Sequence, residues 1–139
     1  DSNTSSIYTI TNGKVETVHA DATLGGTNGI LVEENTIYLA GYGSGNVYRM
    51  DMTTKSVEKI ATDVPGGDGI VRYGEDLLVS NWNGQVYHVT MDGVVTLLLD
   101  SQEAKLNAAD IEVIADKNML LVPTFFGNGV TAYQLAENK

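Results

Sequence analysis

Apolar and polar residues alternate over short segments along the whole chain. Residues 85–90 (QVYHVT) are a clear example of this alternation, which is typical of half-buried β-strands. Turn-forming pairs such as Asn12-Gly13 and Asn83-Gly84 separate the segments. No window carries a helical stripe longer than a turn or two. The pattern predicts an all-β fold.

Three landmarks recur in a fixed order about every forty residues. Isoleucines after Gly or Asp stand at Ile30, Ile70 and Ile111, with spacings of 40 and 41 residues. An apolar quartet follows each of them, and then a strand with a Val-Tyr pair or a looser version of it. Each repeat holds four short strands, and four-stranded sheets at this period are β-propeller blades. The alternative, a β-sandwich, does not predict landmarks in fixed order at near-constant spacing.

The repeat predicts one partial β-propeller over residues 1–139. In each blade the strands are named A to D from the channel outward. The expected strands are 6–11, 15–19, 29–33, 36–40, 46–51, 56–61, 69–73, 76–80, 85–90, 94–99, 110–115, 119–123 and 130–135, and residues 101–107 could form a short helical turn. The expected blades are strands C and D in 1–20, a full blade in 21–64, a full blade in 65–100, and strands A to C in 101–139.

These ranges amount to about three and a quarter blades. Known propellers have roughly 4 to 8 blades, so an arc of this size cannot close by itself. Its first and last sheets would leave apolar faces and edges in water. We therefore expect the remaining blades to come from an upstream segment or from a second chain. The upstream segment is preferred, because the chain ends one strand short, as in a ring whose N-terminus supplies the last outer strand.

Composition narrows the range of partners. The 139 residues are 42% hydrophobic and 19% charged, as in ordinary globular domains. The net charge is −10, with 18 acidic and 8 basic residues, so no nucleic acid and no anionic membrane surface is expected as a partner. The absence of cysteine excludes disulfides, zinc-thiolate sites and thiol catalysis.

Oxygen-bearing side chains stand at or beside the start of the innermost expected strands, at Asn28, Asp68 and Asp110. Consecutive strands run antiparallel, so these side chains should converge on one mouth of the channel. Carboxylate and amide oxygens suit a hard cation such as calcium or magnesium. Alternatively, Asn and Asp before Gly are common turn formers, and a turn repeated every forty residues would recur at these positions.

Aromatic residues occupy equivalent positions in the loops between strands B and C, at Tyr42, Trp82 and Phe125. They should form a rim on the face that carries the oxygen-bearing residues. They could contact a substrate, or they could fill the space between adjacent blades. The two histidines, His19 and His88, fall far from the channel and have no nucleophilic partner, so a structural role is expected for both.

Several runs resemble one family. The segments 27–30 (TNGI), 67–70 (GDGI), 77–82 (LLVSNW) and 84–87 (GQVY) are similar to the senescence-marker-protein, gluconolactonase and luciferin-regenerating-enzyme family. The stretch 107–133 is similar to the ending of a bacterial branch of that family. The resemblance covers essentially the whole chain and maps it to the second half of a six-bladed propeller.

The resemblance implies a site and an activity. It implies one divalent metal held by a Glu, an Asn and an Asp from different blades, with Asn28 and Asp68 matching the Asn and the Asp. The Glu would lie in an upstream blade. Calcium is expected first, with magnesium or zinc as alternatives. In the family the Asp also acts as acid or base when a lactone ring opens.

The implied function is metal-dependent hydrolysis of lactones or similar small esters, with Asp68 catalytic. One alternative is a non-catalytic propeller that binds a small ligand or a protein partner on its loop face. Another is a structural module formed by two half-rings. A periplasmic or secreted location is what many bacterial relatives suggest. Because propellers host many unrelated activities, the fold alone does not establish any of these.

Overall fold

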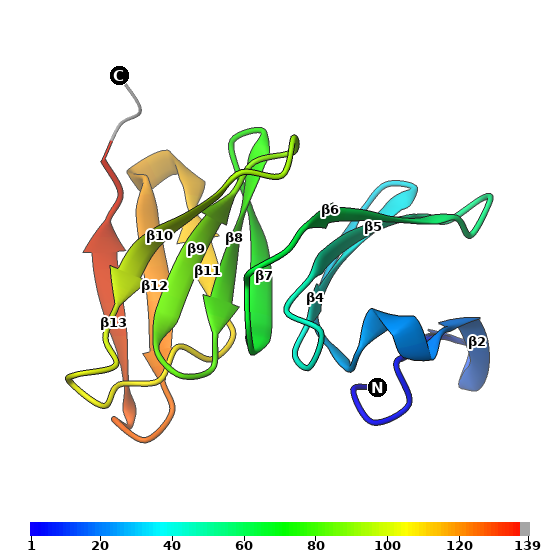
Figure 1. Cartoon of the computed structure of the whole chain (residues 1–139), viewed down its shortest axis with the longest axis horizontal. Coiled ribbons are helices and arrows are strands. Elements are labelled where there is room, and N and C mark those ends of the chain that lie inside the picture. The colour runs from blue at the N-terminus through cyan, green and yellow to red at the C-terminus, as the bar shows by residue number, and fades with distance from the viewer. Residues whose placement is uncertain (137–139) are drawn as a thin grey trace.

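The computed structural model describes residues 1–136, which form thirteen strands in four successive antiparallel sheets (Figure 1). The strands are β1 (Ser6–Thr11), β2 (Lys14–Ala20), β3 (Thr27–Glu33), β4 (Thr36–Gly41), β5 (Val47–Asp51), β6 (Val57–Ala61), β7 (Gly67–Tyr73), β8 (Asp76–Asn81), β9 (Gln85–Val89), β10 (Val95–Asp100), β11 (Glu112–Ile114), β12 (Met119–Thr124) and β13 (Gly129–Gln134). Two short 3₁₀ helices, η1 (Ala22–Leu24) and η2 (Ala115–Lys117), lie between strands.

Each sheet is a meander in which neighbours in sequence are neighbours in space. The sheets are β1-β2, β3-β4-β5-β6, β7-β8-β9-β10 and β11-β12-β13. They follow one another from the blue N-terminal end to the red C-terminal end in Figure 1. The strands β3, β7 and β11 are innermost, and β3 and β11 both contact β7. This arrangement places the starts of β3 and β7 together.

All thirteen expected strands are present, most with ends shifted by one or two residues. The strand expected over 110–115 is shorter, because its last residue enters helix η2 and it begins only at Glu112. The helical turn considered for residues 101–107 is wrong. That segment forms a hydrogen-bonded turn in which the Lys105 N–H donates to the Gln102 carbonyl. The part of the expected last blade after residue 136 lies outside the described residues.

The core lies between the sheets. On β4, Tyr38 and Ala40 pack toward the β7–β10 sheet, whereas Ile37 and Leu39 pack toward the β1–β2 sheet. This alternation gives both faces of β4 an apolar partner, so the strand is almost continuously buried. A third cluster, which includes Leu120, joins the last two sheets.

A polar contact also joins two sheets. Arg72 on β7 donates from Nε to both carboxylate oxygens of Glu33 on β3, at 3.1 and 3.2 Å. Its guanidinium lies 4.7 Å from the centre of the Tyr38 ring. The hydrogen bond from Arg72 holds the pKa of Glu33 below its usual value, against the opposing effect of burial.

The two ends of the arc leave apolar side chains in water, as expected. Ile30 on β3 is 53% exposed, whereas Ile70, one repeat later on β7, is 4% exposed. Ile70 is covered because it packs in the cluster formed with β3 and β4. Ile30 has no equivalent cover, because none of the described strands lies on the inner side of β1. At the other end, Val130 on β13 is also exposed. Among residues 1–136, no helix is long and apolar enough to cross a membrane.

Candidate metal and ligand site

The innermost strands β3 and β7 begin with the same irregularity. Their pairing register shifts between Thr27 and Gly29 in β3 and between Gly67 and Ile70 in β7. A β-bulge adds one residue to a strand and redirects its side chain. Asn28 and Asp68 occupy these irregular positions. The strands therefore present both side chains outside the regular alternation.

Glycines let the innermost strands approach closely. A Cβ atom on Gly29 would overlap the backbone carbonyl oxygen of Asp68, and Gly69 lies in the same way against the backbone of Asp110. Backbone atoms cannot move aside as a flexible side chain can, so these positions require glycine. The close approach brings Asn28 to Asp68 and Asp68 to Asp110.

The three oxygen-bearing residues form one cluster. Asn28 donates a hydrogen bond from Nδ2 to Oδ1 of Asp68. Asp68 is partly buried, whereas Asn28 and Asp110 are exposed. Burial raises the pKa of Asp68, the negative charge of Asp110 raises it further, and the hydrogen bond from Asn28 opposes both effects. The side chain of Asn28 thus bonds across to the neighbouring strand, whereas a turn former would bond its own backbone.

A buried serine fixes the spacing near Asp110. Ser80 Oγ accepts a hydrogen bond from the Gly69 N–H and donates one to the carbonyl of Ala109, both at 2.7 Å. It therefore ties β7 and β8 to the residue that precedes Asp110. Ser80 was not among the residues predicted from the sequence. Its signal was a hydroxyl in an otherwise apolar quartet, where a buried polar group needs partners.

The donor set suits a hard cation. Asn28, Asp68 and Asp110 offer an amide oxygen and two carboxylates, and a positive charge between the carboxylates would offset their mutual repulsion. Within residues 1–136, no group of three or more His, Cys, Asp or Glu side chains is placed to hold a metal ion. The described residues therefore supply two carboxylates and one amide, and any further protein ligand would have to come from elsewhere.

An aromatic cluster lies on the same face as these oxygens. Trp82, which follows β8, has its ring centre 5.0 Å from that of Phe125, and Phe125 lies 5.1 Å from Phe126. Of the three predicted rim residues, the structure brings Trp82 and Phe125 together. Among the aromatic pairs of the described residues, Tyr42 has none with them. Phe126 was missed because the prediction took one aromatic residue per loop.

The opposite face carries a cavity of about 950 Å³ between the third and fourth sheets. Tyr73 stands five positions after Asp68 on β7, which corresponds to at most about 16 Å at roughly 3.3 Å per residue. The cavity is lined by Leu31, Val71, Arg72, Tyr73, Gly74, Glu75, Asp76, Glu112, Val113, Ala115 and Asn118, none of which belongs to the predicted site.

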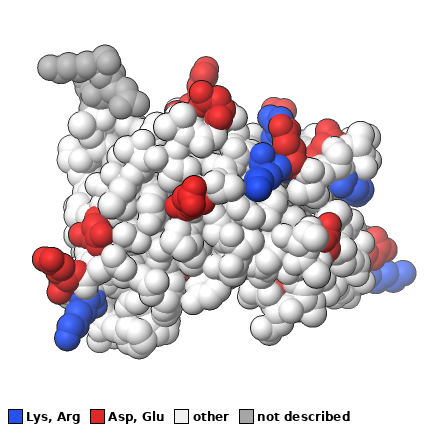
Figure 2. Space-filling model, viewed as in Figure 1, with Lys and Arg blue, Asp and Glu red and all other residues white. Residues whose placement is uncertain are grey.

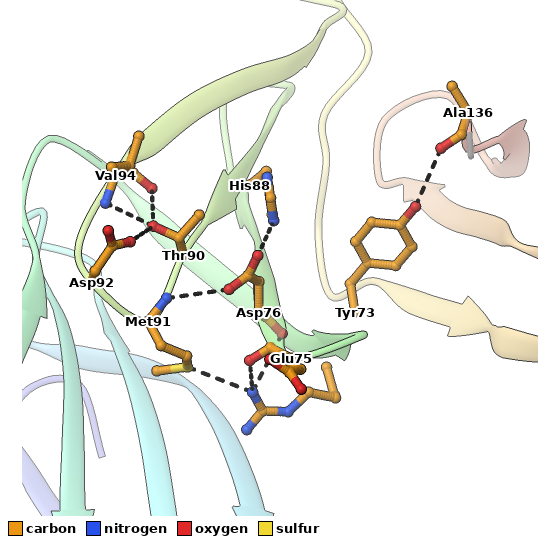
Figure 3. Close-up of polar contacts among 10 residues, drawn as sticks. Tyr73, Glu75, Asp76, His88, Thr90, Met91, Asp92, Val94 and Ala136 are labelled. Carbon is orange, nitrogen blue, oxygen red and sulfur yellow. Dashed lines mark hydrogen bonds and ion pairs between the residues drawn. The ribbon is translucent and has the colours of Figure 1, made fainter. Parts of the chain in front are cut away.

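Most polar groups around this cavity have partners. Figure 3 shows Asp76 between His88 and the backbone of Met91, and Tyr73 reaching toward the carbonyl of Ala136. The Nε2 atom of His88 lies 2.9 Å from Asp76. The other histidine, His19, lies on β2. Neither histidine belongs to the cluster of Asn28, Asp68 and Asp110, and their structural roles stay a prediction.

Charge is dispersed on the surface. On the face of the described residues shown in Figure 2, acidic side chains are scattered and the few basic ones lie close to acidic ones. No basic patch is visible on that face of residues 1–136. A nucleic-acid interface of the ordinary kind would need such a patch.

Comparison with known proteins identifies the architecture. No family model and no curated protein matches this chain. Among solved structures, it is similar to the calcium-binding protein regucalcin from Agrobacterium tumefaciens, with 23% identity and a TM-score of 0.63 over 84% of this chain and 43% of that one. It is also similar to a luciferin-regenerating enzyme, with 18% identity and a TM-score of 0.66 over 86% of this chain and 43% of that one.

A chain of a nidogen–laminin complex is similar as well, with 12% identity and a TM-score of 0.70 over 93% of this chain and 58% of that one. At these identities the similarity is one of fold. The chain is a partial β-propeller of four-stranded antiparallel blades, and it spans between 43% and 58% of the length of these three structures.

Proposed function

We propose that this chain forms part of a metal-dependent hydrolase of lactones or similar small esters, within a six-bladed propeller. The observation that carries the proposal is the contact between Asn28 and Asp68 at the starts of adjacent innermost strands, with Asp110 beside them. Side chains forty residues apart meet there because two bulges and two glycines converge at this point. Such repeated irregularities are common next to active sites.

Asn28 and Asp68 are the proposed metal ligands, and Asp110 is a candidate third ligand or a contact for the substrate. A bound divalent cation supplies Lewis-acid polarisation of the ester carbonyl. Asp68 accepts a proton from the attacking water and returns it to the leaving oxygen. Its place at the irregular start of β7, beside Asn28 and close to Asp110, puts this carboxylate where the cation and the ester would meet.

Calcium is the first candidate for the cation. The oxygen-only donor set favours calcium or magnesium over metals that prefer nitrogen or sulfur ligands, and zinc is a less favoured alternative. The solved structure of regucalcin, to which this chain is similar in fold, is described as that of a calcium-binding protein. The remaining ligands and the remaining blades are proposed to come from outside residues 1–139.

The test combines calcium titration calorimetry with an assay of lactone hydrolysis on the protein with its remaining blades. We expect Asp68→Asn and Asn28→Ala each to weaken calcium binding at least about tenfold, and Asp68→Asn also to abolish hydrolysis. The control is Asp92→Asn, in the exposed turn between β9 and β10. An Asp68→Asn protein with unchanged calcium affinity and full activity would falsify the proposal.

A second candidate function is binding without catalysis. The exposed aromatic cluster and the presence of only two carboxylates among the described residues favour it. It predicts that calcium or a small ligand binds at the loop face while no lactone is hydrolysed. The same calorimetry and hydrolysis assay separate the two functions.

A further inference from the structure

Three aromatic rings meet in the loops of the last two sheets and remain open to water. Phe125 is 59% exposed and Phe126 is 71% exposed, while Trp82 is partly buried. The ring centres of Trp82 and Phe126 are 6.4 Å apart, and the two rings are nearly perpendicular. The rings of Phe125 and Phe126 are also nearly perpendicular, with their centres 5.1 Å apart. We call these three residues the aromatic platform.

The platform is not the packing between blades that the sequence alone allowed. Side chains that fill the space between these two sheets, such as Val86 and Leu120, are 0% and 1% exposed. Phe125 and Phe126 follow the end of β12 in a turn, beyond the strands of the last sheet. Two large apolar rings left in water at a loop face are typical of a surface that binds a ligand.

Hydrogen bonds place the platform beside the oxygen cluster. The N–H of Trp82 donates to the carbonyl of Gly66, two residues before Asp68, at 3.0 Å. The carbonyl of Trp82 accepts a hydrogen bond from Asn107, three residues before Asp110, at 3.0 Å. Two to three residues of chain span at most about 7–10 Å. A small ligand can therefore reach both groups at once.

We infer that the aromatic platform binds a planar apolar part of the ligand whose polar group lies at Asn28, Asp68 and Asp110. The inference rests on the proposed function and gives its substrate class as lactones or esters fused to, or carrying, an aromatic ring. Aromatic rings attract one another in offset and edge-to-face arrangements, such as the platform already shows. A polyhydroxylated sugar lactone would instead need several hydrogen-bonding side chains on this surface.

The chain carries its own reporter for this site. Trp82 is its single tryptophan, so fluorescence excited at a wavelength that tyrosine does not absorb reports on the platform. The experiment titrates residues 1–139, diluted until light scattering shows a single copy, with plain δ-valerolactone and with the same lactone fused to a benzene ring. We expect the benzo-fused lactone to bind about tenfold more tightly or better, because only it can stack on the platform.

Substitutions identify the residues responsible. Phe125→Ala and Phe126→Ala should each reduce the preference for the fused lactone, and the double variant should bring it within about twofold. Phe126→Leu keeps an apolar side chain without the ring and should reduce the preference about as much as Phe126→Ala. Tyr42→Ala, at the equivalent loop of the preceding blade but outside the platform, should leave the preference unchanged. Urea denaturation of each variant verifies that it folds.

The outcomes separate this inference from the proposed function. If the fused lactone gives no fluorescence response, or if the double variant keeps the full preference, the platform does not bind the ligand. This conclusion holds whether or not calcium binds at Asp68. If the preference depends on Phe125 and Phe126 while Asp68→Asn changes neither calcium affinity nor hydrolysis, the platform stands and the hydrolase proposal fails. Either result is decisive for its own claim.

Discussion

Gly69 on β7 lies against the backbone just before β11. A Cβ atom at position 69 would be 2.9 Å from the Cα of Asp110 and 2.7 Å from the amide nitrogen of Ile111. Gly29 lies against Asp68 in the same way. The innermost strands can lie this close only because Gly29 and Gly69 have no side chain. The distance between the candidate ligands depends on the same two glycines.

Substituting this glycine should destabilise the fold. We expect Gly69→Ala to lower the free energy of unfolding by about 1–3 kcal/mol, because the new methyl group meets backbone atoms that cannot rotate away. Gly129→Ala is the matched control, since a Cβ there meets only ordinary contacts at 3.7 and 3.8 Å. Urea denaturation measures both. Equal stability of the two variants would contradict the close approach.

Ser80→Ala tests the hydrogen bonds that hold Ala109. The substitution leaves the Gly69 N–H and the Ala109 carbonyl without their partner in a buried place, which should cost about 1–3 kcal/mol of unfolding free energy. Ser56→Ala, at an exposed position, should change stability by less than about 0.5 kcal/mol. If Ser80→Ala is as mild as this control, the bridge does not hold the two strands together.

Asp68→Asn should stabilise the metal-free chain at neutral pH. The pKa of Asp68 is raised by burial and by Asp110, so folding favours its protonated form and ionisation weakens the fold as the pH rises. We expect a melting temperature a few degrees higher for the variant at about pH 7, and a smaller difference at about pH 3.

Calcium provides the second arm of that experiment. A cation that binds only the folded state raises the melting temperature, and it does so more the more tightly it binds. It should do so for the wild-type protein with its remaining blades, and much less for Asp68→Asn. A variant that is less stable than the wild type at neutral pH without metal would show that the charge of Asp68 is favourable as it stands.

The ion pair between Arg72 and Glu33 should make stability depend on pH. The pKa of Glu33 is lowered, so its contribution is present above the ordinary glutamate value of about 4.3 and is lost as the pH falls through the lowered value. Glu33→Gln should therefore destabilise the chain at neutral pH and approach the wild type at about pH 2–3.

The control for this pair is Glu58→Gln. Glu58 pairs with Arg49, but its side chain is 66% exposed, and such surface pairs contribute about 0–1 kcal/mol. Denaturation midpoints at several pH values measure both variants. If Glu33→Gln and Glu58→Gln follow the same pH profile, the ion pair between β3 and β7 contributes no more to stability than an exposed surface pair.

Much of the fold follows from local pattern. Alternation of apolar residues and the forty-residue recurrence of Ile30, Ile70 and Ile111 define the strands and their grouping, because each blade repeats the same order of strands and turns. The starts of the innermost strands also follow from this topology. For that reason the sequence alone was enough to place Asn28, Asp68 and Asp110 on one face.

The finer features depend on contacts between blades, which no single repeat reveals. The glycine after Asn28 suggested a turn, but its role is to admit the backbone of the next blade. Ser80 has an Ala counterpart at position 40, so its hydroxyl stands out in the sequence, but the partners of its two hydrogen bonds do not follow from the repeat. Phe126 has no aromatic counterpart in the earlier loops, and only the cluster with Trp82 gives it a role.

The strands at the two ends of the arc, which are paired on one side only, affect the tendency of this polypeptide to associate in solution. Among the strands of residues 1–136, β1 pairs only with β2 and β13 only with β12, so each leaves a row of amide and carbonyl groups without a strand beside it. Exposed edges next to exposed apolar side chains recruit other chains. In concentrated solution residues 1–139 should associate with themselves, and dilution or a charged substitution such as Ile10→Lys should keep them apart.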